Sequence, residues 1–339
     1  MTSSSPLQLT ATNLAAFNRA SSGPIMTPPS VLVLGAGELG LAVLTALAAH
    51  PLRPRVATLS VLLRQATLDS AAPAKKRAVQ HMRGLGADFE AADVVAASVE
   101  ELASVMGRYD TVVSCCGMEL PPGTQTKLAE AALRAGVRRF FPWQFGMDYD
   151  VIGKGSAQDL FDEQLEVRRV LRAQTATAWT IVSTGLFMSF LFEPAFGVVD
   201  LGARTVRALG RWDNEITVTT PRDIGRVTAD VVLDPRGEGV DGVVYTAGDT
   251  VSYARLADLV DERFGPGKFT RELWDEETLA EQLERDPDSV MAKYRGTFAR
   301  GKGVAWDPST TVNARRGTSM TDVREYLKSM QLNTSGEDS

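Results

Sequence analysis

The chain has 339 residues, 44% of them hydrophobic and 23% charged, which is enough for one large globular core and a smaller second part. This composition excludes disorder of the whole chain. The formal net charge of −6 argues against a nucleic-acid partner, which needs a basic surface, and no uninterrupted apolar run has membrane-spanning length. We therefore expect a globular protein with neither a nucleic-acid nor a membrane partner.

The first 30 residues are rich in Ser, Thr and Ala and lack the basic start and apolar core of a secretory signal. We interpret them as a flexible leader, and the alternative is an arm that folds over the active site. The only cysteines, Cys115 and Cys116, are adjacent, which disfavours a disulfide framework and indicates a reducing, cytoplasmic location. His50 and His81 lie far apart, and no metal-ligand spacing is present, so we expect no metal.

Short apolar runs alternate with segments of helical spacing over the first half of the chain. Strands are expected at 31–34, 58–63, 87–91, 111–115, 140–141 and 179–183, with helices at 38–50, 75–83, 99–107, 123–135 and 158–174. Such alternation predicts an α/β fold with a doubly wound parallel sheet of the Rossmann type.

Beyond Thr184 the alternation becomes looser. We expect an aromatic-rich segment at 187–196, strands at 216–219 and 243–246, helices at 221–233 and 253–264, and an outer helix over the charged stretch 271–285. The predicted organisation is a leader at 1–30, a Rossmann domain at 31–185, a smaller and mainly substrate-binding region with outer helices at 186–330, and a flexible tail at 331–339.

A glycine-rich turn, Gly35-Ala36-Gly37-Glu38-Leu39-Gly40, lies between the first strand and the first helix. Gly35 would permit the tight turn, Gly37 would let the backbone approach a pyrophosphate, and Gly40 would allow close packing of helix against strand. Free N–H groups at the start of the helix would face the anion. The turn, including Glu38 and Leu39, therefore predicts a dinucleotide site.

Arg64 follows the second strand, at the position where NAD-dependent enzymes often have an acid for the ribose hydroxyl. A cationic side chain there suits the extra phosphate of NADP, and charge-assisted bonds of this kind contribute roughly 1.5–3 kcal/mol each. We therefore predict NADPH or NADP as the cofactor.

The fourth strand ends in Ser114-Cys115-Cys116-Gly117, at the sheet edge where ligands lie in such folds. We expect Cys115, Cys116 and Gly117 to line the cofactor site. A nucleophilic or redox role for the cysteines would need an activating group, and no histidine lies near them in the sequence, so packing is the favoured interpretation.

Residues 31 to about 330 resemble the atypical short-chain dehydrogenases of the isoflavone reductase, phenylcoumaran benzylic ether reductase and NmrA-like group. The resemblance is carried by the run Val137-Arg138-Arg139-Phe140-Phe141-Pro142-Trp143-Gln144-Phe145-Gly146-Met147-Asp148, by Phe161 and Val167-Arg168-Arg169, and by Ile181-Val182-Ser183-Thr184-Gly185-Leu186-Phe187. Within the group the chain is most similar to the fungal CipA-like branch, which is linked to secondary metabolism. The resemblance implies a Rossmann domain, NADPH as hydride donor, and a smaller substrate-binding region.

The chain departs from the pattern of this group at three places. Leu34 replaces the first glycine of the group's Gly-x-x-Gly-x-x-Gly, and Trp143-Gln144 replaces the usual Ser-Glu after Pro142. The resemblance still places Trp143 and Gln144 at the cofactor. The lysine that the reductases use in catalysis aligns with Gln164, whose amide can orient a carbonyl but cannot release a proton.

Two catalytic candidates and two substrate contacts remain. Tyr149 follows the matched Phe-Gly segment, so it is either a catalytic acid or a phenol in the pocket wall, and Gln164 is the other candidate. Phe187, just after the sixth strand, and Met147 are expected to contact the substrate.

We expect an NADPH-dependent reductase of a small apolar metabolite, aromatic or polyketide-like, which could form a homodimer. A redox-neutral enzyme such as an isomerase or dehydratase, a reductase of an already activated quinone or iminium, and a non-catalytic NADP-sensing regulator remain open, because the glycine turn fits them all.

Overall fold

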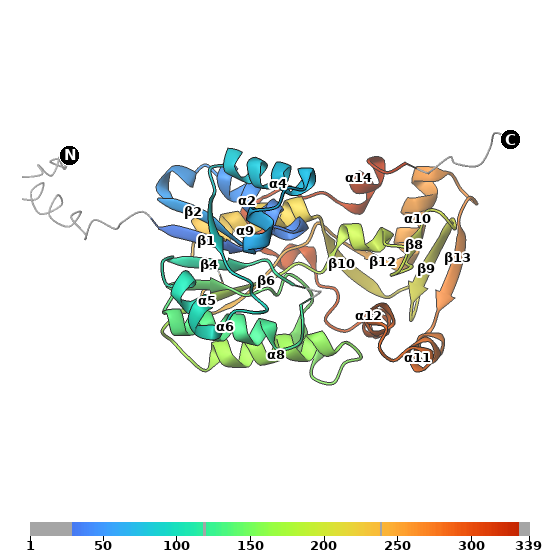
Figure 1. The fold of residues 1–339 in the computed structure, drawn as a ribbon. Coiled ribbons are helices and arrows are strands. Elements are labelled where there is room, and N and C mark those ends of the chain that lie inside the picture. The colour runs from blue at the N-terminus through green and yellow to red at the C-terminus, as the bar shows by residue number, and fades with distance from the viewer. Residues whose placement is uncertain (1–28, 118–119, 238, 332–339) are drawn as a thin grey trace, which may run out of the picture.

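The computed structural model describes residues 29–117, 120–237 and 239–331. Apart from residues 29, 30 and 331, the predicted leader and tail lie outside the described residues. Figure 1 shows a large sheet with helices on both sides next to a smaller part built around two short sheets.

The large sheet has seven parallel strands, in the order β11-β6-β5-β4-β1-β2-β3. These strands are β1 (Ser30–Leu34), β2 (Thr58–Leu63), β3 (Asp88–Ala91), β4 (Thr111–Ser114), β5 (Arg139–Phe141), β6 (Ala178–Ser183) and β11 (Gly242–Tyr245). The order reverses between β1 and β4, so the chain leaves these two neighbouring strands in opposite directions and opens a crevice beyond their carboxyl ends. The predicted doubly wound α/β fold is confirmed.

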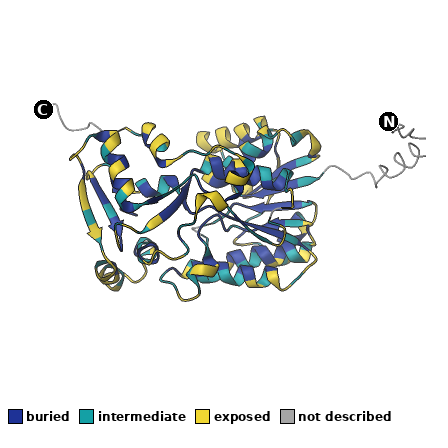
Figure 2. Ribbon diagram, turned by 180° about the vertical axis from the view of Figure 1, so that it is seen from behind, coloured by how far each residue is buried: buried dark blue, intermediate teal, exposed yellow. Residues whose placement is uncertain are grey.

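Each face of this sheet packs against its own layer of helices. α2 (Glu38–Ala49), α4 (Pro73–Gly84) and α9 (Pro221–Leu233) cover one face, and α5 (Val99–Met106), α6 (Thr124–Ala135) and α8 (Asp159–Arg172) cover the other. Side chains of β1 alternate accordingly, with Val31 and Val33 in the first layer's core and Leu32 and Leu34 in the second's. Figure 2 shows the strands buried between helices whose outer faces are exposed.

The last strand of the large sheet comes from beyond the predicted domain boundary at residue 185. β11 pairs with β6, and α9 packs against α2. The sheet therefore draws on both sides of that boundary, and the division at 185 stays a prediction.

The second part contains two three-stranded sheets, β12-β10-β7 and β13-β9-β8. Their strands are β7 (Leu186–Phe187), β8 (Val199–Asp200), β9 (Thr205–Leu209), β10 (Glu215–Thr219), β12 (Asp249–Ser252) and β13 (Thr270–Trp274). The helices of this part are α10 (Tyr253–Phe264), α11 (Glu276–Arg285), α12 (Val290–Ala299) and α14 (Val323–Lys328). The shorter elements of the chain are η1 (Arg53–Arg55), α3 (Gln65–Leu68), α7 (Tyr149–Ile152), η2 (Met188–Phe192), η3 (Pro308–Thr310) and α13 (Val312–Arg316).

The prediction of a single helix over 271–285 is wrong for the first third of that range. Residues 270–274 form β13, which pairs in parallel with β9, and the helix begins only at Glu276. Asp275 separates the two elements because its carboxylate accepts a hydrogen bond from the backbone N–H of Thr278 and caps the helix. Pairing with β9 thus overrides a charge pattern that also fits a helix.

Candidate active site

The three glycines of the turn after β1 have different physical roles. Gly35 has a φ of +84°, and a Cβ there would lie 2.5 Å from Cys116 Sγ. A Cβ on Gly40 would lie 2.2 Å from the carbonyl oxygen of Gly35, so only glycine lets α2 pack against the turn. A Cβ on Gly37 would have no protein atom within 4 Å. Gly35 and Gly40 are therefore required by the fold, and Gly37 leaves open space for a ligand.

The N-terminus of α2 opens onto that space. Its N-cap residue is Gly37, which has no side chain to bond the first N–H groups of the helix. Helix N-termini of this kind favour anions, through the backbone N–H groups and the helix dipole together. The turn therefore has both the space and the polarity that a pyrophosphate requires.

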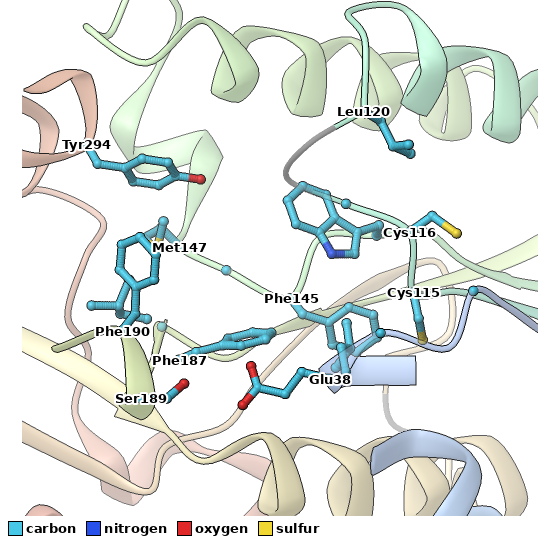
Figure 3. A pocket seen from close by; sticks show the side chains of 18 of the residues that line it. Glu38, Cys115, Cys116, Leu120, Phe145, Met147, Phe187, Ser189, Phe190 and Tyr294 are labelled. Atoms are coloured by element: carbon cyan, nitrogen blue, oxygen red, sulfur yellow. The ribbon is translucent and has the colours of Figure 1, made fainter. Parts of the chain in front are cut away.

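A cavity of about 550 Å³ begins at this turn and extends into the second part of the molecule (Figure 3). It is lined by Gly35, Gly37, Glu38, Leu39, Cys115, Cys116, Gly117, Leu120, Trp143, Phe145, Gly146, Met147, Tyr149, Gly185, Leu186, Phe187, Ser189, Phe190 and Tyr294. Most residues predicted for cofactor and substrate thus meet in one place.

Trp143 forms one wall of the cavity. A Cβ on Gly117 would lie 1.9 Å from Cε2 of the Trp143 indole, so the ring lies directly against the Gly117 backbone. Gly117, which follows β4 by three residues, is therefore the residue that makes room for the indole. The Trp143 indole, which stands where the group that this chain resembles usually has Ser, shapes the cavity without adding a charge.

The two cysteines are poor nucleophiles at this site. Burial raises the pKa of the Cys116 thiol to about 11, and burial together with the neighbouring Cys116 raises the pKa of Cys115 well above its ordinary value. Neither cysteine is in a disulfide, and the raised pKa values keep both thiols protonated at neutral pH. Their position supports the packing interpretation of the sequence.

Tyr149 lies in the cavity wall, at the start of α7, and is buried. Burial raises the pKa of its phenol, although the charge of Arg168 and a backbone hydrogen bond from Met147 act in the opposite direction. The Arg168 guanidinium lies over the Tyr149 ring, 5.2 Å from its centroid. The hydroxyl is consequently neutral throughout the physiological range and can donate a hydrogen bond.

Gln164 and Gln144 do not line the cavity. Both side chains are fully buried between α8 and the segment after β5. Gln144 Nε2 donates to the backbone carbonyl of Gln164, and Arg168 Nε donates to Gln144 Oε1, each over 2.8 Å. These bonds hold the Gln144 amide against α8. The structure thus gives no support to a catalytic Gln164 or a cofactor-binding Gln144.

Arg64 lines a second depression, of about 560 Å³, beyond the carboxyl ends of β2 and β3. The other lining residues are Gln65, Ala66, Thr67, Lys75, Ala91, Ala92 and Asp93. Arg64 is exposed, and Lys75 gives the depression a second cation that the sequence analysis did not single out. This is where the adenosine end of a dinucleotide held at the glycine turn would extend in a doubly wound sheet.

Several residues that line the cavity at the glycine turn were not predicted, among them Leu120, Phe145, Ser189, Phe190 and Tyr294. Ser189 and Phe190 come from η2, and Tyr294 comes from α12, more than a hundred residues further along the chain. The aromatic residues beyond Thr184 indicate in general that this wall is aromatic. No pattern in the sequence around Tyr294 indicates that this residue lines the cavity.

Glu38 is the only charged side chain among the described residues that line this cavity. Figure 3 shows its carboxylate directed toward Phe187 and Ser189. The remaining walls are apolar or carry neutral hydroxyls and thiols. Such a cavity can hold an apolar, ring-shaped ligand beside a bound cofactor, and it offers hydrogen bonds more readily than protons.

The family model for the NmrA-like family matches residues 28–327. This chain belongs to the NmrA-like family. An NmrA-like family domain-containing oxidoreductase of Gibberella moniliformis is 60% identical over 303 residues, which cover 89% of this chain and 98% of that protein. The predicted family is therefore confirmed.

Solved structures show that this NmrA-like chain shares the fold of two reductases. An isoflavone reductase superimposes with a TM-score of 0.72 at 22% identity, covering 89% of this chain and 99% of that one. A leucoanthocyanidin reductase in binary complex with NADPH, from Vitis vinifera, gives a TM-score of 0.71 at 21% identity, covering 88% and 98%. At this level of identity the likeness concerns the fold alone.

None of the helices in the described ranges is long and apolar enough to cross a bilayer. Over the same ranges, no group of three or more His, Cys, Asp or Glu side chains could hold a metal ion.

Proposed function

We propose that this NmrA-like protein is an NADPH-dependent reductase of a small, apolar metabolite of aromatic or polyketide-like shape. The proposal rests on one observation, which is that the predicted dinucleotide site and the apolar cavity share a wall. The glycine turn that suits a dinucleotide also forms one end of the cavity of about 550 Å³, whose other walls are mainly apolar and aromatic. A compound in this cavity would lie beside the cofactor.

The residues at the sheet edge fit NADPH. Gly37 and the N-terminus of α2 suit its pyrophosphate, and Arg64 with Lys75 suits the phosphate on its adenosine ribose. When bound, the cofactor supplies a hydride. The chain's own residues bind the two partners, align them and exclude water from the space between them.

The proposed reductase and its alternatives differ in whether a side chain in the cavity has to donate a proton to the substrate. Burial raises the pKa values of Tyr149, Tyr294 and both thiols among the described residues that line the cavity, so these groups hold their protons at neutral pH. This favours acceptors that are already activated, such as quinones or iminium ions, over simple ketones. It also keeps a redox-neutral enzyme as the second candidate and an NADP-sensing regulator as the third.

The decisive experiment measures NADPH oxidation with menadione, N-methyl-3,4-dihydroisoquinolinium and 1-tetralone. We expect one of the two activated acceptors to be reduced faster than the ketone. A positioned general acid commonly contributes about 10²–10⁴ in rate, so a loss of that size in Tyr149→Phe, with Gln164→Ala near normal, would identify Tyr149 as the proton donor. Tight NADPH binding without turnover of any acceptor would instead favour the sensor.

A further inference from the structure

We propose that the hydroxyl of Tyr294 is the hydrogen-bond donor that holds an oxygen atom of the substrate. The substrate class is thereby narrowed to apolar ring compounds that carry a carbonyl or ether oxygen. This inference rests on the proposed function, because it concerns the same cavity. Tyr294 is a positioning residue in this proposal and transfers no proton.

The ring of Tyr294 is fixed by its neighbours. The residue is only 4% exposed on α12, and its ring centroid lies 5.6 Å from that of Phe161 and 5.9 Å from that of Phe190. Figure 3 shows the ring entering from the second part of the molecule, with its hydroxyl directed into the cavity. A ring packed in this way holds its hydroxyl in one place at little further entropic cost.

That hydroxyl has no hydrogen-bond partner among the described residues, although its ring is packed on two sides. A ligand oxygen placed against this hydroxyl would accept its hydrogen bond in a cavity whose other walls are mainly apolar. The observation points to a ligand because the hydroxyl faces an open cavity instead of a packed core.

The two other hydroxyls among the described residues that line the cavity fit this role less well. The Tyr149 hydroxyl lies against the Gly146 backbone, 2.3 Å from where a Cβ on Gly146 would stand, whereas the Tyr294 hydroxyl faces the open cavity. Ser189 is half-buried and faces Glu38 in Figure 3. Tyr253 also has an unpartnered buried hydroxyl, but it does not line the cavity. Tyr253 therefore serves as a matched control for the loss of a buried phenol group.

The electrostatics of the site define which oxygen would be bound. Burial raises the pKa of Tyr294, and the neighbouring Tyr149 adds to this shift, so the phenol remains a neutral donor. A neutral donor suits a neutral acceptor, and the Glu38 carboxylate on the same cavity disfavours an anionic one. Carbonyl and ether oxygens meet both conditions.

The test compares two probes that differ by one oxygen, 1-tetralone and tetralin, and measures their binding to the NADP⁺-loaded protein by calorimetry. Tyr294→Phe should weaken binding of 1-tetralone about tenfold, the equivalent of about 1.4 kcal/mol, and leave tetralin within about twofold. Tyr253→Phe and Ser189→Ala should change neither affinity. The selectivity of the unmodified protein for the ketone should be constant up to about pH 10, the ordinary pKa of a phenol.

Three results would overturn the inference. Equal weakening of both probes by Tyr294→Phe would show that the ring contributes packing alone, and selective weakening by Ser189→Ala would assign the oxygen to that residue. Failure of both probes to bind the unmodified protein would exclude this class of ligand. If binding is selective as expected but no acceptor is reduced, only the proposed reductase activity fails.

Discussion

Gln144 donates a hydrogen bond to the backbone carbonyl of Gln164, yet the side-chain amide of Gln164 has no hydrogen-bond partner among the described residues. The side-chain amides of these two neighbouring glutamines therefore contribute differently to the free energy of unfolding. Gln144 links the segment after β5 to α8 and to the buried Arg168, whereas the amide of Gln164 is buried without compensation.

This contrast predicts opposite effects of one substitution at the two positions. Gln164→Leu should raise the free energy of unfolding by about 1 kcal/mol, because it removes a buried unpaired amide, and it should leave NADPH binding unchanged. Gln144→Leu should lower it by about 1–3 kcal/mol, because Arg168 Nε loses its acceptor. Urea denaturation measures both. Equal destabilisation by the two variants would mean that the Gln164 amide has a partner in solution.

A pH dependence follows from Asp150, which joins α7 to α8. Its carboxylate accepts hydrogen bonds from Arg172 and Arg168. Arg172 above all, and Arg168 with it, lower the pKa of this carboxylate from its ordinary value of 3.8 to about 2, although partial burial acts in the opposite direction. A depressed folded-state pKa stabilises the protein above the unfolded pKa, and this contribution is lost as the pH falls toward 2. Asp150→Asn should therefore destabilise the protein at pH 7, and the difference from the unmodified chain should shrink below about pH 4.

The control for this experiment is Asp213→Asn. Asp213 pairs with Arg211 on the surface, where an ion pair contributes little. Urea midpoints measured at several pH values should show a large pH-dependent loss for Asp150→Asn and almost none for Asp213→Asn. A pH-independent difference at position 150 would contradict the electrostatic explanation.

Cofactor preference depends on Arg64 in our proposal. NADPH should bind more tightly than NADH, and Arg64→Glu should reduce the NADPH affinity by about 10- to 150-fold, the equivalent of 1.5–3 kcal/mol, while NADH changes little. Lys76→Glu makes the same change of charge on α4 without facing the depression and serves as the control. Equal affinities of the unmodified protein for both nucleotides would refute the assignment of Arg64.

The glycine turn allows binding and folding to be separated. Gly37→Val should abolish nucleotide binding and leave the fold intact, because its side chain would enter space that holds no protein atom within 4 Å of the Cβ. Gly40→Ala should destabilise the protein, because its Cβ would collide with the Gly35 carbonyl. Nucleotide titration and circular dichroism distinguish the two effects. Unchanged binding by Gly37→Val would place the cofactor elsewhere.

The nucleotide-binding part of the fold could be predicted from the sequence because the patterns that indicate its strands, turns and helices are local. The apolar run of β1, the three glycines and the alanine-rich α6 each depend on neighbours within a few residues, and the structure confirms them. β13 escaped detection because its strand character comes from pairing with β9 and not from its own charged sequence.

The candidate site was predictable only in part, for the same reason. The positions after β1 and β4 follow from the rule that ligands lie at the carboxyl edge of a parallel sheet. Gln164 was selected from an aligned position, but the direction of its side chain depends on how α8 packs, which no local pattern shows. Tyr294 enters the cavity through the packing of α12 against Phe161 and Phe190, a contact between segments far apart in the chain.

The path of the chain between the two parts restricts how such a protein can evolve. After β6 the chain builds β7 to β10 in the second part, returns to the large sheet for α9 and β11, and leaves it again at β12. A fragment that ended at residue 185 would expose the edge of β6 and the face of α2 that α9 covers. New specificities in this lineage should therefore arise through replacement of single wall residues, such as Trp143 or Tyr294, and not through exchange of a whole substrate module by recombination.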